Sequence, residues 1–179
     1  MDIDLKTEIQ GKKTFLVVMQ SRQYQDQILN LTLQMNSTFN RIAYISLNRL
    51  ITPLRRQLEE NKINVEKFFF IDGITKTAIP NPPSMNNTIF VPSPNDLTKL
   101  SIAVTKVLQT FDPDCIFFDS LSTLLIYEDM TIISQFVHSL INKINAYGIR
   151  AVLTCLEGDK EQQLIKDLSL ILDKVISPQ

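Results

Sequence analysis

Several short apolar runs of this sequence are followed at once by polar or charged residues that could do chemistry. The run at residues 14–19 leads into Gln20-Ser21-Arg22-Gln23, the run at 41–47 leads into Asn48-Arg49, and the run at 114–119 ends in Asp119 before Ser120. Serine and arginine can hold an anion, and a carboxylate can hold a divalent cation. The candidate ligand-binding residues are therefore Ser21, Arg22, Gln23, Asn48, Asp119 and Ser120, with Asp119 as the candidate metal ligand.

These residues also have structural interpretations. Ser21 can cap the helix expected to follow it, with Arg22 as a solvated side chain. Asp119 can accept hydrogen bonds from backbone N–H groups or from Ser120, instead of serving a metal or a polar network. The sequence leaves both pairs of alternatives open.

Other reactive residue types give weaker signals. His138 is the only histidine, which excludes a metal site of several histidines, and its place beside an apolar helical stripe predicts a surface residue. Cys115 and Cys155 fall within apolar runs and lack a charged neighbour that would favour the thiolate. We expect both cysteines to be small buried hydrophobic residues and not nucleophiles.

The apolar runs alternate with segments of helical periodicity. The expected strands are residues 14–19, 41–47, 67–71, 88–91, 114–119, 150–155 and 174–177. Helices are expected at 23–35, from Thr52 as N-cap with Pro53 at the first position, after Ser93-Pro94-Asn95-Asp96, and over 132–144. This alternation predicts one domain over residues 1–179, a three-layer αβα fold with a mostly parallel central sheet.

Parallel sheets of this kind bind ligands beyond the carboxyl ends of their strands. The candidate residues all follow strands, so we expect them on one rim, where Asp72-Gly73 after the third strand would join them. The Pro-rich stretch 79–87 predicts a loop, either a plain surface loop or one that binds a partner.

Composition limits the function classes. Lys plus Arg number 18 and Asp plus Glu 19, a net charge of −1, so no global field attracts nucleic acid or an anionic membrane. No apolar run reaches about 18 residues, the length of a membrane-spanning helix. Asp2 and Asp4 stand where a signal peptide carries basic residues. We expect a cytoplasmic protein that binds neither membrane nor nucleic acid.

The stretch Pro113-Asp-Cys-Ile-Phe-Phe-Asp119-Ser-Leu-Ser-Thr-Leu-Leu125 resembles the Walker B strand and following turn of RecA-like and KaiC-like ATPases. In that family the aspartate helps to hold Mg²⁺. Residues 92–98 and 168–176 also resemble segments of archaeal KaiC-like proteins, so the resemblance extends over about residues 12–177. It implies a RecA-like fold for the sheet and its helices.

Two catalytic parts of that family have no match here. A P-loop uses glycines to wrap phosphates, a lysine to reach the β- and γ-phosphates, and Ser or Thr to hold Mg²⁺. The matching residues 19–27 contain neither glycine nor lysine, and no glycine occurs from 12 to 72. The family also ends its second strand in two glutamates, one of which orients the attacking water; here Asn48-Arg49 stand there.

The resemblance and the two departures predict a RecA-like pseudo-ATPase without hydrolysis, acting as an interaction or regulatory module that binds a protein partner or itself. The alternative is a regulatory protein that binds ATP or ADP, weakly and with Mg²⁺, through Ser21, Arg22 and Asp119 without rapid hydrolysis. A receiver-like phospho-acceptor is disfavoured, because Gln20-Ser21 and Cys155-Leu156 replace the acidic pair and the lysine that receivers need.

Overall fold

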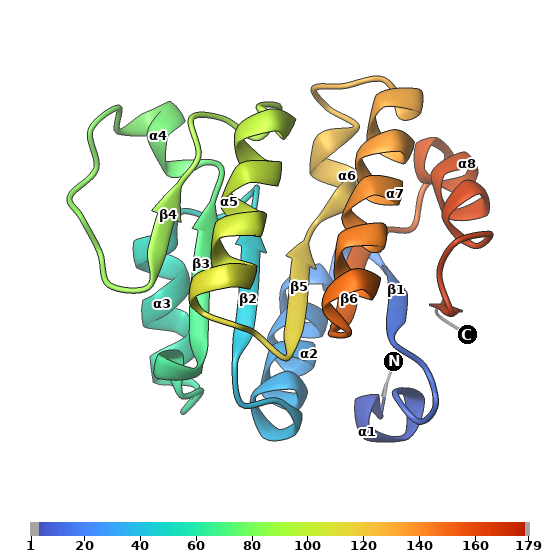
Figure 1. The fold of residues 1–179 in the computed structure, drawn as a ribbon, viewed down its shortest axis with the longest axis horizontal. Helices are drawn as coiled ribbons and strands as arrows, with labels where there is room; N and C mark the ends of the chain where they lie inside the picture. The colour runs from blue at the N-terminus through green and yellow to red at the C-terminus, as the bar shows by residue number, and fades with distance from the viewer. Residues whose placement is uncertain (1–3, 178–179) are drawn as a thin grey trace.

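Seven strands form one all-parallel sheet in the computed structural model, which describes residues 4–177. Their order is β4-β3-β2-β5-β6-β1-β7 (Figure 1). Their bounds are β1 Thr14–Met19, β2 Ile42–Ser46, β3 Phe68–Asp72, β4 Thr88–Phe90, β5 Cys115–Asp119, β6 Arg150–Leu156 and β7 Lys174–Ile176. Every expected strand is confirmed to within one or two residues. Asp2, used above against a signal peptide, lies outside the described residues.

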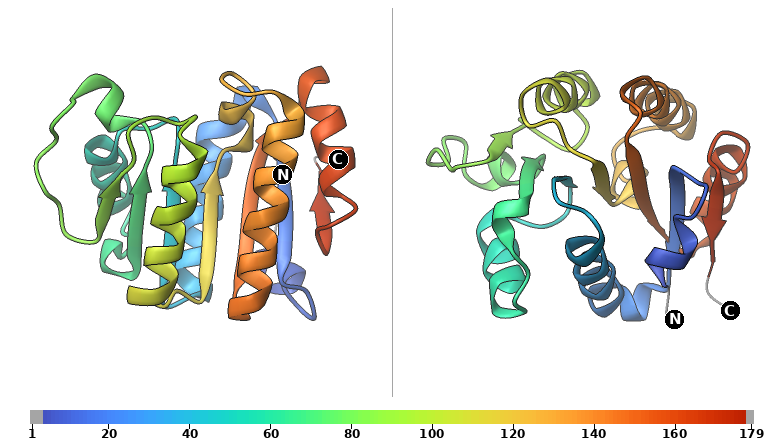
Figure 2. Two further views of the ribbon diagram at one scale, coloured as in Figure 1. Left: turned by 45° about the horizontal axis from the view of Figure 1, so that its top comes forward. Right: turned by 60° about the horizontal axis from the view of Figure 1, so that its bottom comes forward.

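Helices cover both faces of the sheet, as expected for a three-layer fold (Figure 2). One layer holds α1 Leu5–Glu8, α2 Tyr24–Thr38 and α3 Ile51–Glu60, and the other holds α5 Leu97–Thr110, α6 Leu121–Leu124, α7 Met130–Tyr147 and α8 Asp159–Leu168. The short helix α4, Thr75–Ala78, precedes the long loop beside β4 (Figure 1). Two 3-10 turns, η1 Ser21–Gln23 and η2 Val65–Lys67, complete the elements.

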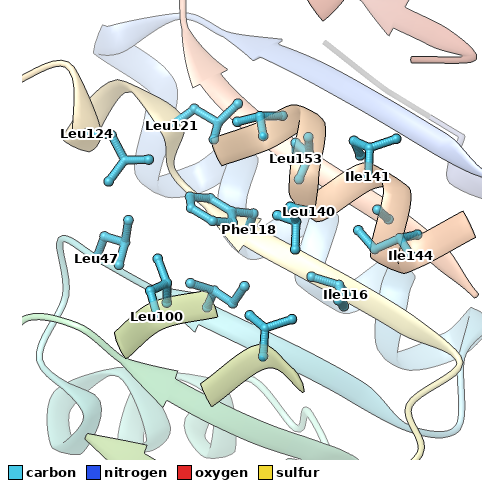
Figure 3. Close-up of a cluster of buried hydrophobic side chains, with 14 of the residues drawn as sticks. Leu47, Leu100, Ile116, Phe118, Leu121, Leu124, Leu140, Ile141, Ile144 and Leu153 are labelled. Carbon is cyan, nitrogen blue, oxygen red and sulfur yellow. The ribbon is translucent and has the colours of Figure 1, made fainter. Parts of the chain in front are cut away.

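The sheet divides the core into two clusters because successive strand residues point to opposite faces. Ile116 and Phe118 of β5 pack beneath α5 and α7, together with Leu140 and Ile144 (Figure 3). Phe117 points the other way, toward α2 and α3. Strands covered on both faces are apolar throughout, which is why their runs are readable in the sequence.

The cysteines and the histidine lie where expected. Cys115 and Cys155 are free and buried, and His138 is exposed on α7. Burial raises the pKa of the Cys115 thiol well above its ordinary value and that of Cys155 to about 12. Both thiols therefore stay protonated at neutral pH, which agrees with an inert, structural role.

One predicted helix start is wrong. Helix α3 begins at Ile51 with Leu50 as N-cap, so Thr52 and Pro53 lie inside its first turn and Thr52 does not cap it. The N–H of Ile51 donates to the Asp72 carboxylate at 3.1 Å. A carboxylate from a distant strand thus takes the place of a local cap. By contrast, Asp96 caps α5 within the predicted start signal, accepting the N–H of Lys99 at 2.9 Å.

Among residues 4–177, no helix is both long and apolar enough to cross a membrane.

Candidate functional site

Three polar side chains lie level at the carboxyl ends of neighbouring strands. Ser46 at the end of β2 pairs in register with Asp72 of β3 and with Asp119 of β5. All three residues are fully buried. The register places them on the α2 and α3 face, since Phe117, two residues before Asp119, packs in that core cluster. The strand ends therefore gather two carboxylates within one buried row.

The Asp119 carboxylate is surrounded by side-chain donors. The Tyr24 hydroxyl donates to Oδ1, and the Tyr44 hydroxyl donates to Oδ2 at 2.7 Å. Nη2 of Arg49 lies 2.9 Å from the same Oδ2, in an ion pair, and also donates to the Tyr44 hydroxyl. Both carboxylate oxygens are thus engaged by the protein itself. We call Tyr24, Tyr44, Arg49 and Asp119 the Asp119 network.

Each member of the network is positioned by a different element. Tyr24 is the first residue of α2 and Tyr44 lies within β2. Arg49 follows β2, where the Ser46 hydroxyl donates to its carbonyl oxygen at 2.8 Å. Its second terminal nitrogen, Nη1, donates to Oε1 of Gln57 on α3 at 3.1 Å. The guanidinium is therefore held from both sides, which fixes its fork geometry against the carboxylate.

Burial dominates the electrostatics of this network. It raises the pKa of the Asp119 carboxyl to about 8, because the ionised form loses its water. Burial also raises the pKa of the Tyr44 hydroxyl, against the effect of Arg49. Tyr44 therefore stays a neutral hydrogen-bond donor at physiological pH.

The structure brings only some of the candidate residues together. Asn48 joins the network, since its Nδ2 donates to the Tyr24 hydroxyl at 3.0 Å. Ser120 is buried directly after Asp119, at the N-cap of α6. By contrast, the side chains of Ser21, Arg22 and Gln23 are exposed on η1, the turn that precedes α2.

Of the two alternatives for Ser21, the interpretation as the cap of the following helix is wrong. Ser21 lies inside the 3-10 turn η1, and the N-cap position of α2 falls on Gln23, which forms no side-chain capping bond. The extra turn between β1 and α2 displaces the start of the helix by two residues. Instead, the side chain of Gln27 reaches back from α2, and its Oε1 accepts the N–H of Gln20 at 3.1 Å.

The candidate residues taken from the sequence omit Tyr24, Tyr44 and Gln57, and also Arg49, which enters only as a departure from the KaiC-like pattern. Tyr44 carried a signal: a tyrosine inside a strand buried on both faces must find a partner for its hydroxyl. The partner, Asp119, lies 75 residues away along the chain, and only the sheet register brings the two together. Tyr24 and Gln57 carried no comparable signal, since both lie in ordinary amphipathic helices.

The residues of the network do not fit a bound Mg²⁺. This ion needs carboxylate oxygens free to coordinate it and room for several waters, whereas a guanidinium lies against Asp119. Within the described part of the chain, no three His, Cys, Asp or Glu side chains gather as a metal site would require. In the structure the Asp119 carboxylate belongs to a polar network of side chains, and a metal-binding role for it stays a prediction.

The second carboxylate of the row has a different set of partners. Asp72 accepts the backbone N–H groups of Ile51 at 3.1 Å and of Ile74 and Thr75 at 2.8 Å. The Thr75 hydroxyl donates to it as well. Asp72 therefore satisfies the otherwise unpaired donors at the starts of α3 and α4.

Comparison with known proteins agrees with this architecture. A family model described as "Family of unknown function (DUF7504)" matches residues 52–177. Among solved structures, a KaiC-like protein of the hyperthermophilic archaeon Pyrococcus horikoshii superposes with a TM-score of 0.65 and 13% sequence identity, over 92% of this chain and 70% of that one. No match was found among the curated proteins. The protein is a member of the DUF7504 family, of unknown function, with a KaiC- and RecA-like fold of seven parallel strands flanked by helices.

Proposed function

We propose that this protein is a non-hydrolysing relative of the KaiC-like ATPases that acts as a protein-interaction or regulatory module. The Asp119 network is the observation that carries this proposal. Asp119 ends the strand that resembles a Walker B strand, where an ATPase keeps a carboxylate available to Mg²⁺. Here Tyr24, Tyr44 and Arg49 engage both of its oxygens.

The charge at this point supports the same conclusion. In a metal-dependent ATPase, the cation offsets the negative charge of the carboxylate and of the phosphates. In this chain the guanidinium of Arg49 offsets the charge of Asp119 at 2.9 Å. A MgATP complex on Asp119 would have to displace Arg49 from its contact with the carboxylate.

The turn after β1 gives independent support. A phosphate-binding loop relies on glycines at left-handed backbone positions and on a lysine. Residues 20–23 contain neither, and Gln20 at φ −74° and Gln23 at φ −115° both lie outside the left-handed region. This turn is a 3-10 turn that leads straight into α2.

The residues after β2 also argue against hydrolysis. A glutamate at this position would orient the attacking water, but asparagine is no general base and arginine carries the opposite charge. Asn48 donates to Tyr24 and Arg49 pairs with Asp119. Both residues are thus part of the network that engages the carboxylate, and neither can activate water.

The test is phosphate release from MgATP by the purified protein, with Asp119→Ala as a matched control for contaminating ATPases. We expect the two proteins to release phosphate at the same background rate. Turnover by the wild type that is lost in Asp119→Ala would overturn the proposal.

A second candidate function has one observation in its favour. Arg22 and Ser21 are exposed beside the start of α2, a helix of 15 residues whose first turn has no side-chain cap. Uncapped N–H groups with an adjacent arginine attract anions, so this end could hold the phosphates of ATP or ADP without hydrolysing them. Arg22→Ala should then weaken nucleotide binding; equal binding by wild type and variant would remove this candidate.

A further inference from the structure

The outer surface between α5 and α7 is hollowed into a groove, on the face of the sheet opposite to the Asp119 network. The two helices run side by side in front of the sheet (Figure 1). The groove between them is a shallow hollow of about 640 Å³ that is open to solvent, and a neighbouring hollow along α7 continues it through Gln135, Ser139 and Lys143. These dimensions are in the range of ligand-binding clefts.

Apolar side chains are exposed along this groove. Ile102 of α5 is 59% exposed and Ile132 of α7 is 43% exposed, while Phe136 is partly buried between them and the core. A single exposed isoleucine is ordinary, but these two share one groove with an aromatic residue. The groove therefore offers contact to apolar side chains of a partner.

The charges along the groove are of one sign. Helices α5 and α7 contain Lys99, Lys106 and Lys143 but no aspartate or glutamate, although the whole chain has a net charge of −1. Asp96 and Asp129 lie at the N-caps of the two helices and do not line the groove. Among the side chains that the structure describes, the ion pairs involve none of the three lysines.

The ammonium group of Lys143 is positioned by hydrogen bonds to α5. Its ammonium lies 2.7 Å from the Ser101 hydroxyl and 3.0 Å from the Thr105 hydroxyl, across the groove on α5. Both partners are neutral, so they orient the ammonium without neutralising it. Lys106 is exposed on the same wall. Carboxylates of a partner would meet both cations at the groove surface.

We propose that the α5/α7 groove binds an acidic amphipathic helix of a partner protein. The apolar face of that helix would pack on Ile102, Ile132 and Phe136, and its carboxylates would meet Lys106 and Lys143, which is the helix-in-groove mode of recognition. A flat bilayer does not fit a concave groove, and nucleic acid would leave the isoleucines without apolar partners. The inference rests on the proposed function only in that the chain acts by binding a protein.

The test uses a fluorescent 18-residue helical peptide, which has the length of α7, with leucines on one face and glutamates on the other. A second peptide carries lysine in place of every glutamate. Anisotropy should report binding of the acidic peptide alone, weakened at high salt by screening of the charges. Amide shifts of labelled protein should change on α5 and α7.

Three variants locate the binding. Lys106→Glu should weaken it about tenfold by repulsion and Ile102→Ser about fivefold by loss of apolar contact. Arg56→Glu, the same change of charge on the exposed side of α3, should leave it unchanged. Unchanged thermal midpoints would show that these surface variants remain folded.

Three results would each overturn the inference. The acidic peptide could fail to bind, the lysine peptide could bind as tightly as the acidic one, or all three variants could bind the acidic peptide with the same affinity. Concentration-dependent self-association lost in Ile102→Ser would assign the groove to a second copy instead. ATP turnover lost in Asp119→Ala would overturn the proposed function and leave the peptide result standing, so the two failures are distinguishable.

Discussion

Asp72 and Asp119 are both buried strand-end carboxylates, level with Ser46 in one row, yet they are held by different kinds of partner. Asp72 accepts three backbone N–H groups, at the starts of α3 and α4. Asp119 accepts only side-chain donors, from α2, from β2 and from the turn after β2. Asp72 therefore stabilises the starts of two helices, whereas Asp119 binds side chains that the fold alone does not require.

The difference distinguishes a carboxylate that the fold requires, Asp72, from one whose partners the fold does not require, Asp119. Backbone donors must be satisfied whatever the function, so Asp72 has a structural role in any protein with these two helix starts. The partners of Asp119 are replaceable side chains, and two of them, Tyr24 and Arg49, lie in segments where the resemblance to KaiC-like ATPases expects a phosphate- or water-binding group. This contrast supports the proposal that the side chains of Tyr24, Tyr44 and Arg49 close the Asp119 centre, which means that they occupy the carboxylate in place of Mg²⁺ and nucleotide.

The largest expected effect is on stability, from Asp72→Ala. Removal of the carboxylate leaves the N–H groups of Ile74 and Thr75 without an acceptor and leaves that of Ile51 with only the Thr75 hydroxyl at 3.4 Å. Each lost acceptor costs about 1–3 kcal/mol, so the free energy of unfolding should fall by about 4 kcal/mol. Urea denaturation measures this, with Asp72→Asn, which keeps one acceptor oxygen, as a milder control. A loss below about 1 kcal/mol for the alanine variant would contradict a capping role.

Arg49→Met should have the next largest effect. It keeps most of the apolar stem but removes the counter-charge of Asp119, so above about pH 8, where the carboxyl is ionised, the free energy of unfolding should fall by about 3 kcal/mol. The control is Arg56→Met, at an exposed position of α3, which should change the free energy of unfolding by less than about 0.5 kcal/mol. Equal losses in the two variants would remove the argument that Arg49 offsets a buried charge.

The free energy of unfolding should depend on pH through the titration of Asp119. Its pKa is raised in the folded state, so its contribution to stability is full below the unfolded value and is lost as the pH rises through about 8. Between about pH 5 and about pH 9, wild type should therefore lose at least about 1 kcal/mol relative to Asp119→Asn, which cannot ionise. Parallel stability curves for the two proteins would show that Asp119 does not titrate in this window.

Tyr24→Phe should have the smallest effect. It removes one donor to Asp119 and the acceptor for Asn48, with an expected loss of about 1 kcal/mol. Tyr147→Phe, at the exposed end of α7, is the matched control and should be neutral. A neutral Tyr24→Phe would mean that the bond from α2 is not needed to hold the carboxylate.

The sequence predicts the layers of this fold better than its polar contacts. Seven apolar runs are sufficient to predict the strands. The five inner strands are buried on both faces and are therefore apolar almost throughout, whereas the edge strands β4 and β7 are largely half-buried and have short runs. The start of α3 was misplaced because its cap, Asp72, comes from a strand that follows it in the chain. Tyr44 and Gln57 escaped notice for the same reason, since their partners are set by register and helix packing.

The most direct test of the closed Asp119 centre is thermal unfolding with and without millimolar MgATP, MgADP or Mg²⁺ alone. Ligand at about 100 times its dissociation constant adds roughly 2.7 kcal/mol. In a domain of this size, each kcal/mol moves the midpoint by about 2–4 °C. If Arg49 and the two tyrosines occupy the Asp119 carboxylate, the midpoint should stay unchanged within about 1 °C for all three additions. A rise of about 5 °C or more with nucleotide, abolished in Asp119→Ala, would contradict it.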